Sequence, residues 1–276
     1  MLFDYPFGDI ALLAAWIAGA GILVGILAGL FGIGGGAIIV PVLYEVFGMM
    51  AVPAEVRMQL CIGTSLAIII PTTVRSYAEH KKKGAVIPQV VRLWTLPAVI
   101  GVAIGSVIAY FAPPALFKIV FVVFTAFIAV RMLFGTERWN LGSGLPGRGV
   151  LAFFGFITGL VSSLVGVSGG SVSNAVLTLY GQPLQRAVAT SAGVGVPITI
   201  AGTAGYMLAG WPYMAHLPPL SIGFVSVIGF VLMAPVSSYT ASYGVRLAHW
   251  LPRRKLEIAF GCFLLLVGGR FLVSLI

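Results

Sequence analysis

Two glycine-rich stretches decide how this chain folds, Gly25–Leu43 (GILAGLFGIGGGAIIVPVL) and Gly159–Leu177 (GLVSSLVGVSGGSVSNAVL). They lie 134 residues apart and are identical at seven of nineteen positions. Each carries a glycine run inside a long apolar segment, at 32–36 and at 166–170. Such a run disfavours an uninterrupted helix because glycine costs helical stability at every position. The pair predicts a duplicated unit with a broken helix in each half.

The chain around these stretches is strongly apolar. Of its 276 residues, 59% are apolar and 8% are charged, whereas soluble globular proteins carry roughly 25% charged residues. This composition excludes a water-soluble fold, and the long continuous runs favour helices over the alternating strands of a membrane barrel. We expect an all-α polytopic membrane protein with up to ten helices. The eight apolar segments lie at 10–47, 59–77, 89–111, 115–134, 149–180, 187–209, 219–243 and 255–275.

A second block is also duplicated, 126 residues apart. The matched residues are Gln59, Thr64, Ser65, Pro71 and Thr73, with Gln185, Thr190, Ser191, Pro197 and Thr199 as their partners. We therefore divide the chain into repeat one over 1–134, a linker over 135–147 and repeat two over 148–276. Internal duplication is a frequent plan of membrane transporters.

The distribution of Lys and Arg predicts that the second repeat is inverted. If every apolar segment crossed the membrane once, the 16 basic residues would divide 9 to 7 between the two sides. If each glycine-broken segment forms a helical hairpin that returns to its own side, they divide 13 to 3, with only Arg57, Lys118 and Arg270 outside. The second division follows the positive-inside rule. Each repeat is then a broken hairpin plus three transmembrane helices, with a cytoplasmic linker and both termini outside.

Helices broken inside a membrane indicate a polar cavity, because backbone groups freed in hydrocarbon need protein or water as partners. A new helix is expected to begin after each run, near Ala37 and Ser171, with the positive end of its dipole at the break. Two such N-termini, related by inversion, are expected to hold an anion near the midplane. The candidate substrate-binding residues are Gly34, Gly35, Gly36, Ala37, Thr64, Ser65, Ser168, Gly169, Gly170, Ser171, Asn174, Thr190 and Ser191.

Further residues are expected to support this site. Gln59 and Gln185 precede the Thr-Ser pairs by about one turn, where they are placed to hydrogen-bond the glycine turns. Pro71 and Pro197, which are matched in the two repeats, are expected to bend or hinge their helices. Pro41, which follows the first glycine run, is a further supporting candidate.

Alternatives stay open for several of these residues. Glu45, on the return arm of the first hairpin, is a candidate for proton coupling, with an interfacial carboxylate as the alternative. For the glycine runs and for each Ser or Thr, the alternative is close helix packing, which we also expect at Gly101 and Gly105.

Other classes of function are disfavoured. The three histidines lie in or beside loops without metal-ligand spacing, so we expect no metal and no other cofactor. Gly166 to Gly169 matches the Gly-x-Ser-Gly of rhomboid proteases, but no histidine lies within an apolar span to act as the base. We expect no enzyme activity. We interpret the net charge of +9 as a sign of how the chain is oriented in the membrane, rather than of nucleic-acid binding. The expected partners are therefore a small anion and the lipid bilayer. The oligomeric state is left open.

The run Gly29–Gly36 followed by Pro41, the Thr64-Ser65 pair, and the degenerate copy of both resemble the TauE/SafE family of sulfite exporters. The second copy departs from the first with Ser168 and Ala175 in place of glycine and proline. The resemblance implies a secondary transporter, most simply an exporter, of sulfite or an organosulfonate in a bacterial inner membrane. We expect alternating access by rocking of the two repeats, with an anion channel as the alternative.

Overall fold

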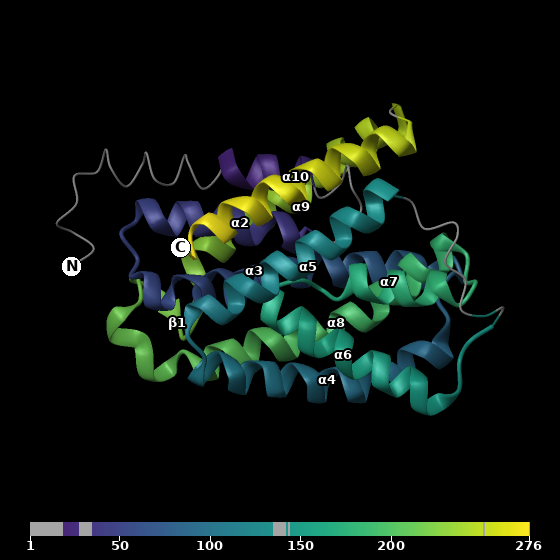
Figure 1. Ribbon diagram of the computed structural model, residues 1–276, viewed down its shortest axis with the longest axis horizontal. Helices are drawn as coiled ribbons and strands as arrows, with labels where there is room; N and C mark the ends of the chain where they lie inside the picture. The colour runs from purple at the N-terminus through teal and green to yellow at the C-terminus, as the bar shows by residue number, and fades with distance from the viewer. Residues whose placement is uncertain (1–18, 28–34, 135–141, 143, 251, 276) are drawn as a thin grey trace.

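A computed structural model of the protein describes residues 19–27, 35–134, 142, 144–250 and 252–275. The chain forms an elongated bundle of helices (Figure 1). Within the described residues, six helices are long and apolar enough to cross a membrane. The expectation of an all-α polytopic membrane protein is confirmed. A helical segment over 19–27 is followed by α2 (Gly36–Met49), α3 (Ala54–Lys82), α4 (Pro88–Phe111), α5 (Pro114–Phe134), α6 (Arg148–Val165), α7 (Gly170–Leu179), α8 (Leu184–Ala209), α9 (Val227–Trp250) and α10 (Arg253–Val273).

The return arms of the glycine-broken segments are short helices. α2 begins at Gly36 and α7 at Gly170, each within one residue of the expected start. The first arm has 14 residues and the second has 10, which correspond to about 21 and 15 Å. Both are shorter than the hydrocarbon core of roughly 30 Å, so the arms are partial spans. Most of the first glycine run, including Gly34, and residues 135–141 of the linker lie outside the described residues.

The prediction of a helix over 219–243 is wrong for the first part of this segment. After the short 3-10 helix η1 (Trp211–His216), strands β1 (Ser221–Ile222) and β2 (Val225–Ser226) form an antiparallel β-hairpin, and α9 begins only at Val227. The reason is local, because Leu220 and Gly223 have φ angles of 57° and 52°. An α-helix of L-residues does not accommodate this left-handed backbone.

The bundle has two distinct ends (Figure 1). The linker end carries residues 144–147, loop 83–87 and the end of α7. The β-hairpin end carries β1, β2, the turn at 50–53 and the last turn of α10.

The outer faces of the peripheral helices are apolar. Exposed residues recur every three or four positions along α4 and α5, which is the spacing of one helical face. Large exposed apolar faces on long helices are suited to contact with lipid. The residues are Leu96, Ile100, Ile104 and Val107 on α4, and Ile119, Val123, Phe127 and Val130 on α5.

Glycines bring α4 and α6 into backbone contact, as expected for Gly101 and Gly105. A methyl group at Gly101 would overlap the carbonyl of Phe156, and one at Gly159 would overlap the carbonyl of Ala98. The contacts advance together along both helices, from Trp94 with Gly155 to Ala98 with Gly159, so the two helices are parallel. Segment 19–27 packs on α9 in the same way, with Gly21 against Met233 and Gly25 against Ser237.

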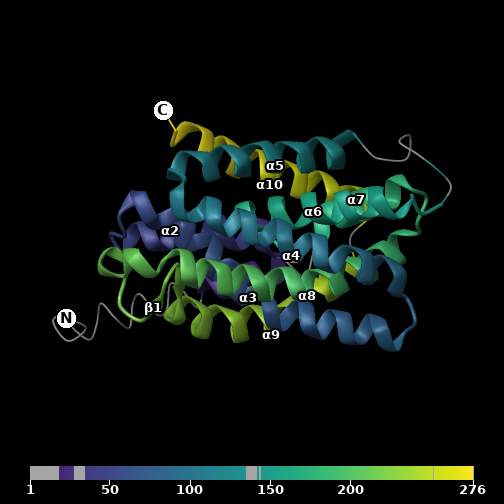
Figure 2. The same cartoon turned by 90° about the horizontal axis from the view of Figure 1, so that it is seen from below.

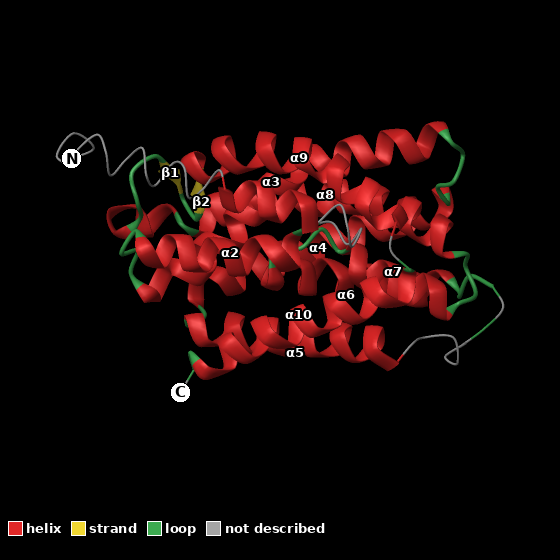
Figure 3. Cartoon of the chain, turned by 90° about the horizontal axis from the view of Figure 1, so that it is seen from above, coloured by secondary structure: helices red, strands yellow, loops and turns green. Residues whose placement is uncertain are grey.

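Two other helix pairs are antiparallel. The contacting pairs between α3 and α8 are Gly63 with Tyr206, Leu66 with Gly202, Thr73 with Gly195, and Tyr77 with Gly193. Between α5 and α10, Lys118 Nζ donates to the carbonyl of Ser274 at 3.1 Å, and Thr125 lies beside Gly268. Figures 2 and 3 show α5 and α10 side by side along one edge of the bundle, with α9 along the opposite edge.

The close approach of α4 and α6 gives a stability prediction. We expect Gly159→Ala to lower the thermal unfolding midpoint in detergent, because the new Cβ meets the backbone of Ala98 and overpacking costs about 1–3 kcal/mol. Gly149→Ala is the matched control on the same helix, since a methyl group at that position would meet no atom within 4 Å. Thermal scanning by size-exclusion chromatography measures both variants. Equal midpoints would contradict the packing assigned to α4 and α6.

Candidate functional site

The two glycine breaks meet inside the bundle. Gly35 and Gly169, which precede α2 and α7, have φ angles of 72° and 77°, and Gly166, which ends α6, has a φ of 80°. These left-handed values favour glycine over any L-residue. Gly36 packs against the carbonyl of Gly166 so closely that a side chain would overlap it. Ser65 Oγ donates to the same carbonyl at 2.8 Å.

The helices that follow the breaks begin without side-chain caps. Neither Gly35 nor Gly169 provides a side-chain hydrogen bond to the first turn of α2 or α7. The carbonyl of Gly35 accepts from the amides of Ile38 and Ile39, both at 2.9 Å. The earliest amides of each helix therefore remain donors with partial positive charge.

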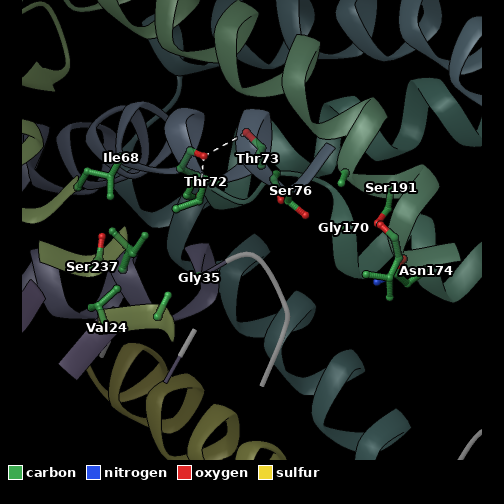
Figure 4. A pocket seen from close by; sticks show the side chains of 16 residues that line it. Val24, Gly35, Ile68, Thr72, Thr73, Ser76, Gly170, Asn174, Ser191 and Ser237 are labelled. Carbon is green, nitrogen blue, oxygen red and sulfur yellow. Dashed lines mark hydrogen bonds between the residues drawn. The ribbon is translucent and has the colours of Figure 1, made fainter. Parts of the chain in front are cut away.

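A cavity of about 270 Å³ lies beside the breaks. Figure 4 shows Gly170, Asn174 and Ser191 on one side of it, across from Val24 and Ser237. The lining residues come from both repeats, namely from segment 19–27, the two breaks, α2, α3, α7, α8 and α9. They are Val24, Gly35, Ile39, Ile68, Ile69, Thr72, Thr73, Ser76, Ser168, Gly170, Asn174, Val188, Ser191, Ala192, Ser237 and Ala241.

The polar groups of this lining are neutral. Thr72 and Thr73 donate their hydroxyl hydrogens to the carbonyl of Ile69, and Ser191 donates to that of Val188. A hydroxyl can rotate to donate to a ligand instead. Among the described residues that line the cavity there is no Lys, Arg, Asp or Glu. The side chain of Asn174 is notable because its Oδ1 is buried without a hydrogen-bond partner in the described structure.

The structure brings five of the candidate binding residues to the cavity wall. These are Gly35, Ser168, Gly170, Asn174 and Ser191. Ala37 and Ser171 are buried in the first turns of α2 and α7. Gly169 packs against Ser162 and Thr158 rather than lining the cavity. Gly34 lies outside the described residues.

Thr64 and Thr190 lie away from the cavity and hold other segments in place. Thr64 Oγ1 accepts from the amide of Ser226 at 2.9 Å, just before α9. Thr190 Oγ1 accepts from the amide of Ile87 at 3.0 Å, just before α4. Each threonine therefore positions a helix of the other half of the chain.

The supporting candidates are dispersed. Gln59 does not bond a glycine turn, because its Nε2 donates to the carbonyl of Ala112 at 3.4 Å. Gln185 is exposed. Pro41, Pro71 and Pro197 lie inside α2, α3 and α8, as expected.

Glu45 lies on α2 outside the cavity lining. Its Oε1 is 3.4 Å from an Arg270 guanidinium nitrogen, and the two side chains are 53% and 63% exposed. Arg57 and Lys118 lie over the ring of neighbouring Tyr44, at 5.3 and 5.5 Å from its centroid. The three cations expected outside thus gather around one part of α2.

Sequence reasoning missed four polar residues of the cavity, Thr72, Thr73, Ser76 and Ser237. Thr73 belongs to the duplicated block and follows Pro71, which was an available signal. Once Thr73 is assigned to the cavity, Thr72 and Ser76 follow, because they lie next to it and one turn after it on α3. Ser237 carried no signal, because its role depends on where α9 packs.

Comparisons with known proteins agree with this architecture. A family model described as "Sulfite exporter TauE/SafE" matches residues 17–271. A probable membrane transporter protein of Haemophilus influenzae is 30% identical over 90% of this chain and 94% of its own length. A probable membrane transporter protein of Methanocaldococcus jannaschii is 28% identical over 90% of this chain and 91% of its own length. A third, from Bacillus subtilis, is 25% identical over 72% of this chain and 81% of its own length. No solved structure matches significantly.

The matched family is described as a sulfite exporter family and the relatives are named as probable membrane transporters, so these comparisons do not support the protease alternative. The family model covers nearly the whole chain, including both glycine breaks and the cavity between them. The chain therefore belongs to the TauE/SafE sulfite exporter family of membrane transporters.

Proposed function

We propose that this protein is a secondary transporter that exports a small sulfur-containing anion, such as sulfite or an organosulfonate. The observation that carries the proposal is the neutral polar cavity at the meeting of two broken helices. The family description supports the substrate class. The cavity is lined by Asn174, whose side-chain Nδ2 can donate a hydrogen bond, by Gly35 and Gly170 at the starts of α2 and α7, and by Ser and Thr hydroxyls.

The chemistry of an oxyanion suits this lining. Each oxygen accepts more than one hydrogen bond, so convergent hydroxyl, amide and helix N-terminal donors satisfy it without a fixed cation. An inside-negative membrane potential favours exit of an anion by about 2.3 kcal/mol per charge per 100 mV. Proton coupling through Glu45 is the alternative driving force, and it would have to act through the Glu45–Arg270 pair.

We also propose that repeats 1–134 and 148–276 are related by inversion across the linker 135–147. The antiparallel packing of α3 on α8 and of α5 on α10 supports this, because each pair joins corresponding helices of the two halves. The matched roles of Thr64 and Thr190 support it further. The linker end is then cytoplasmic, and both termini lie outside the bacterial inner membrane.

Transport in proteoliposomes tests the substrate and the site. We expect saturable, counterflow-competent uptake of radiolabelled sulfite, with taurine and sulfate as competitors. Asn174→Ala is expected to reduce transport efficiency about tenfold or more, since a hydrogen bond to a charged group contributes about 1.5–3 kcal/mol. Thr95→Ala is the control, because Thr95 lies on α4 and bonds only the carbonyl of Val91 in the described structure.

Three outcomes of this assay count against the proposal. Flux without saturation or counterflow would identify a channel. No uptake under either a proton gradient or a membrane potential would remove sulfite as the substrate. An equal effect of Asn174→Ala and Thr95→Ala would remove the cavity as the binding site.

Reporter fusions test the orientation. Alkaline phosphatase fused to the C-terminus of the full chain is expected to be active, because the enzyme matures only outside the cytoplasm. Green fluorescent protein fused at the same position is expected to stay dark after export through the general secretory route. The reverse pair of results would place the linker end outside.

A further inference from the structure

One face of α7 runs from the cavity toward the linker end. Gly170 and Asn174 line the cavity, and Thr178 is the next residue at the same spacing of four. Residues four apart lie on the same side of a helix, each one turn beyond the last. Thr178 is therefore one turn beyond Asn174, and the end of α7 lies at the linker end of the bundle (Figure 1).

Arg131 of α5 contacts this face of α7. Its Nη2 donates to Thr178 Oγ1 at 2.7 Å. The Thr178 hydroxyl in turn donates to the backbone carbonyl of Asn174, also at 2.7 Å. A single hydroxyl thus connects the Arg131 guanidinium to the turn of α7 that carries Asn174, although Arg131 itself lies outside the cavity lining.

Arg131 differs in burial from the other cations of the linker end. It is half-buried, whereas every other Lys or Arg at this end whose side chain the structure describes is exposed. Exposed cations are sufficient to orient a chain by the positive-inside rule, so orientation does not require a half-buried one. The exposed residues are Arg75, Lys81, Lys82, Lys83, Arg92, Arg148, Arg186, Arg254 and Lys255.

The Arg131 guanidinium also lacks a counter-charge. No carboxylate pairs with it among the described residues, and its Nε and Nη1 have no acceptor there. The end of α5 does not need Arg131 as a cap, because Arg254 donates to the carbonyls of Met132 and Leu133. A partly desolvated cation is unfavourable without an anion or a polar partner, and cations placed in this way mark ion pathways in membrane proteins.

We propose that Arg131 binds the transported oxyanion at the linker end of α7, an assignment that rests on the transport function proposed above. A guanidinium presents a planar fork of N–H donors, which suits two oxygens of one anion. The neutral Thr178 hydroxyl holds the guanidinium in place when no anion is bound. Arg131 thus supplies, one helical turn from Asn174, the fixed positive charge that the cavity lining lacks.

This position predicts an effect on capture of the anion rather than on its turnover. A cation at the mouth of a low-dielectric site raises the local concentration of anions. Because Arg131 lies outside the cavity lining, the anion leaves it on entering the cavity. Loss of the guanidinium is therefore expected to raise the KM and to change kcat little.

Transport kinetics and anion binding test Arg131. Arg131→Gln removes the charge, Arg131→Lys keeps the charge without the fork, and Thr178→Val removes the hydroxyl tie but leaves the guanidinium. Arg148→Gln is the control, because it removes an exposed cation at the same end. Sulfite transport is measured in proteoliposomes. Binding is measured as the rise of the thermal unfolding midpoint of the purified protein with sulfite, methanesulfonate or sulfate.

We expect Arg131→Gln to raise the KM for sulfite about tenfold or more, because hydrogen bonds between charged groups are strong ones. Arg131→Lys should raise the KM by a smaller factor. Thr178→Val should leave it nearly unchanged because the cation remains, and Arg148→Gln should do so because an exposed charge is screened. The sulfite concentration that stabilises each protein should change in parallel with its KM.

A purely structural role for Arg131 predicts a different pattern. If Arg131 only ties α5 to α7, Thr178→Val breaks the same tie, so both variants would lower the unfolding midpoint similarly and leave the KM unchanged. That result would overturn the proposal. Equal rises in KM for Arg131→Gln and Arg148→Gln would also overturn it, because they would indicate a diffuse surface charge. Should Arg131→Gln not fold, an unchanged KM of Arg131→Lys would count against the site.

The binding assay separates this site from the proposed substrate. If the wild-type protein transports no sulfite, the substrate assignment fails, and the three anions alone decide the role of Arg131. Stabilisation of the wild type by one of them, with loss of that stabilisation in Arg131→Gln, would support the site. No difference between the two proteins with any of the three would remove it.

Discussion

The structure depends on satisfying backbone groups where helices break inside a membrane. Hydrocarbon provides no hydrogen-bond partners, so an interrupted helix is tolerated only against protein or a polar cavity. Here the break after α6 is enclosed by the start of α2 at Gly36, and Ser65 donates to its exposed carbonyl at Gly166. Because one break covers the other, the site between them draws on both halves of the chain.

Contacts exchanged between the halves hold this arrangement. Segment 19–27 packs on α9 and α6 packs on α4, each through glycines that admit a neighbouring backbone. Thr64 and Thr190 repeat the pattern, because each fixes the residue before a helix of the other half. A single repeat would leave these glycine faces and threonine acceptors without partners. This interdependence explains why the duplicated residues are concentrated at the breaks and at the start of α3 and α8.

Most of the fold and part of the candidate site could be predicted from the sequence. Apolar runs and glycine clusters predicted the helices and the breaks, because both act locally. The β-hairpin escaped prediction, since apolar composition alone does not show the left-handed backbone at Leu220 and Gly223. Duplication identified Thr64 and Ser191 equally, but only Ser191 lines the cavity. A repeated residue can bind or can support, and the distinction depends on the packing of α3 and α8. Ser237 could not be predicted either, because its place in the cavity depends on how α9 packs.

A cavity without a fixed cation has a consequence for turnover. A buried Lys or Arg would hold an anion strongly and would itself need a partner once the anion left. Hydroxyls and helix N-termini avoid both problems, since hydroxyls such as Thr73 return to backbone carbonyls when the site is empty. Asn174 differs, because its Oδ1 is an acceptor that keeps no partner in the described structure, and only its Nδ2 can donate to an anion. Neutral donors that re-pair within their own helix therefore suit a site that must be vacated in every cycle. The cations Arg57, Lys118 and Arg270 lie instead around Tyr44 and Glu45, outside the cavity.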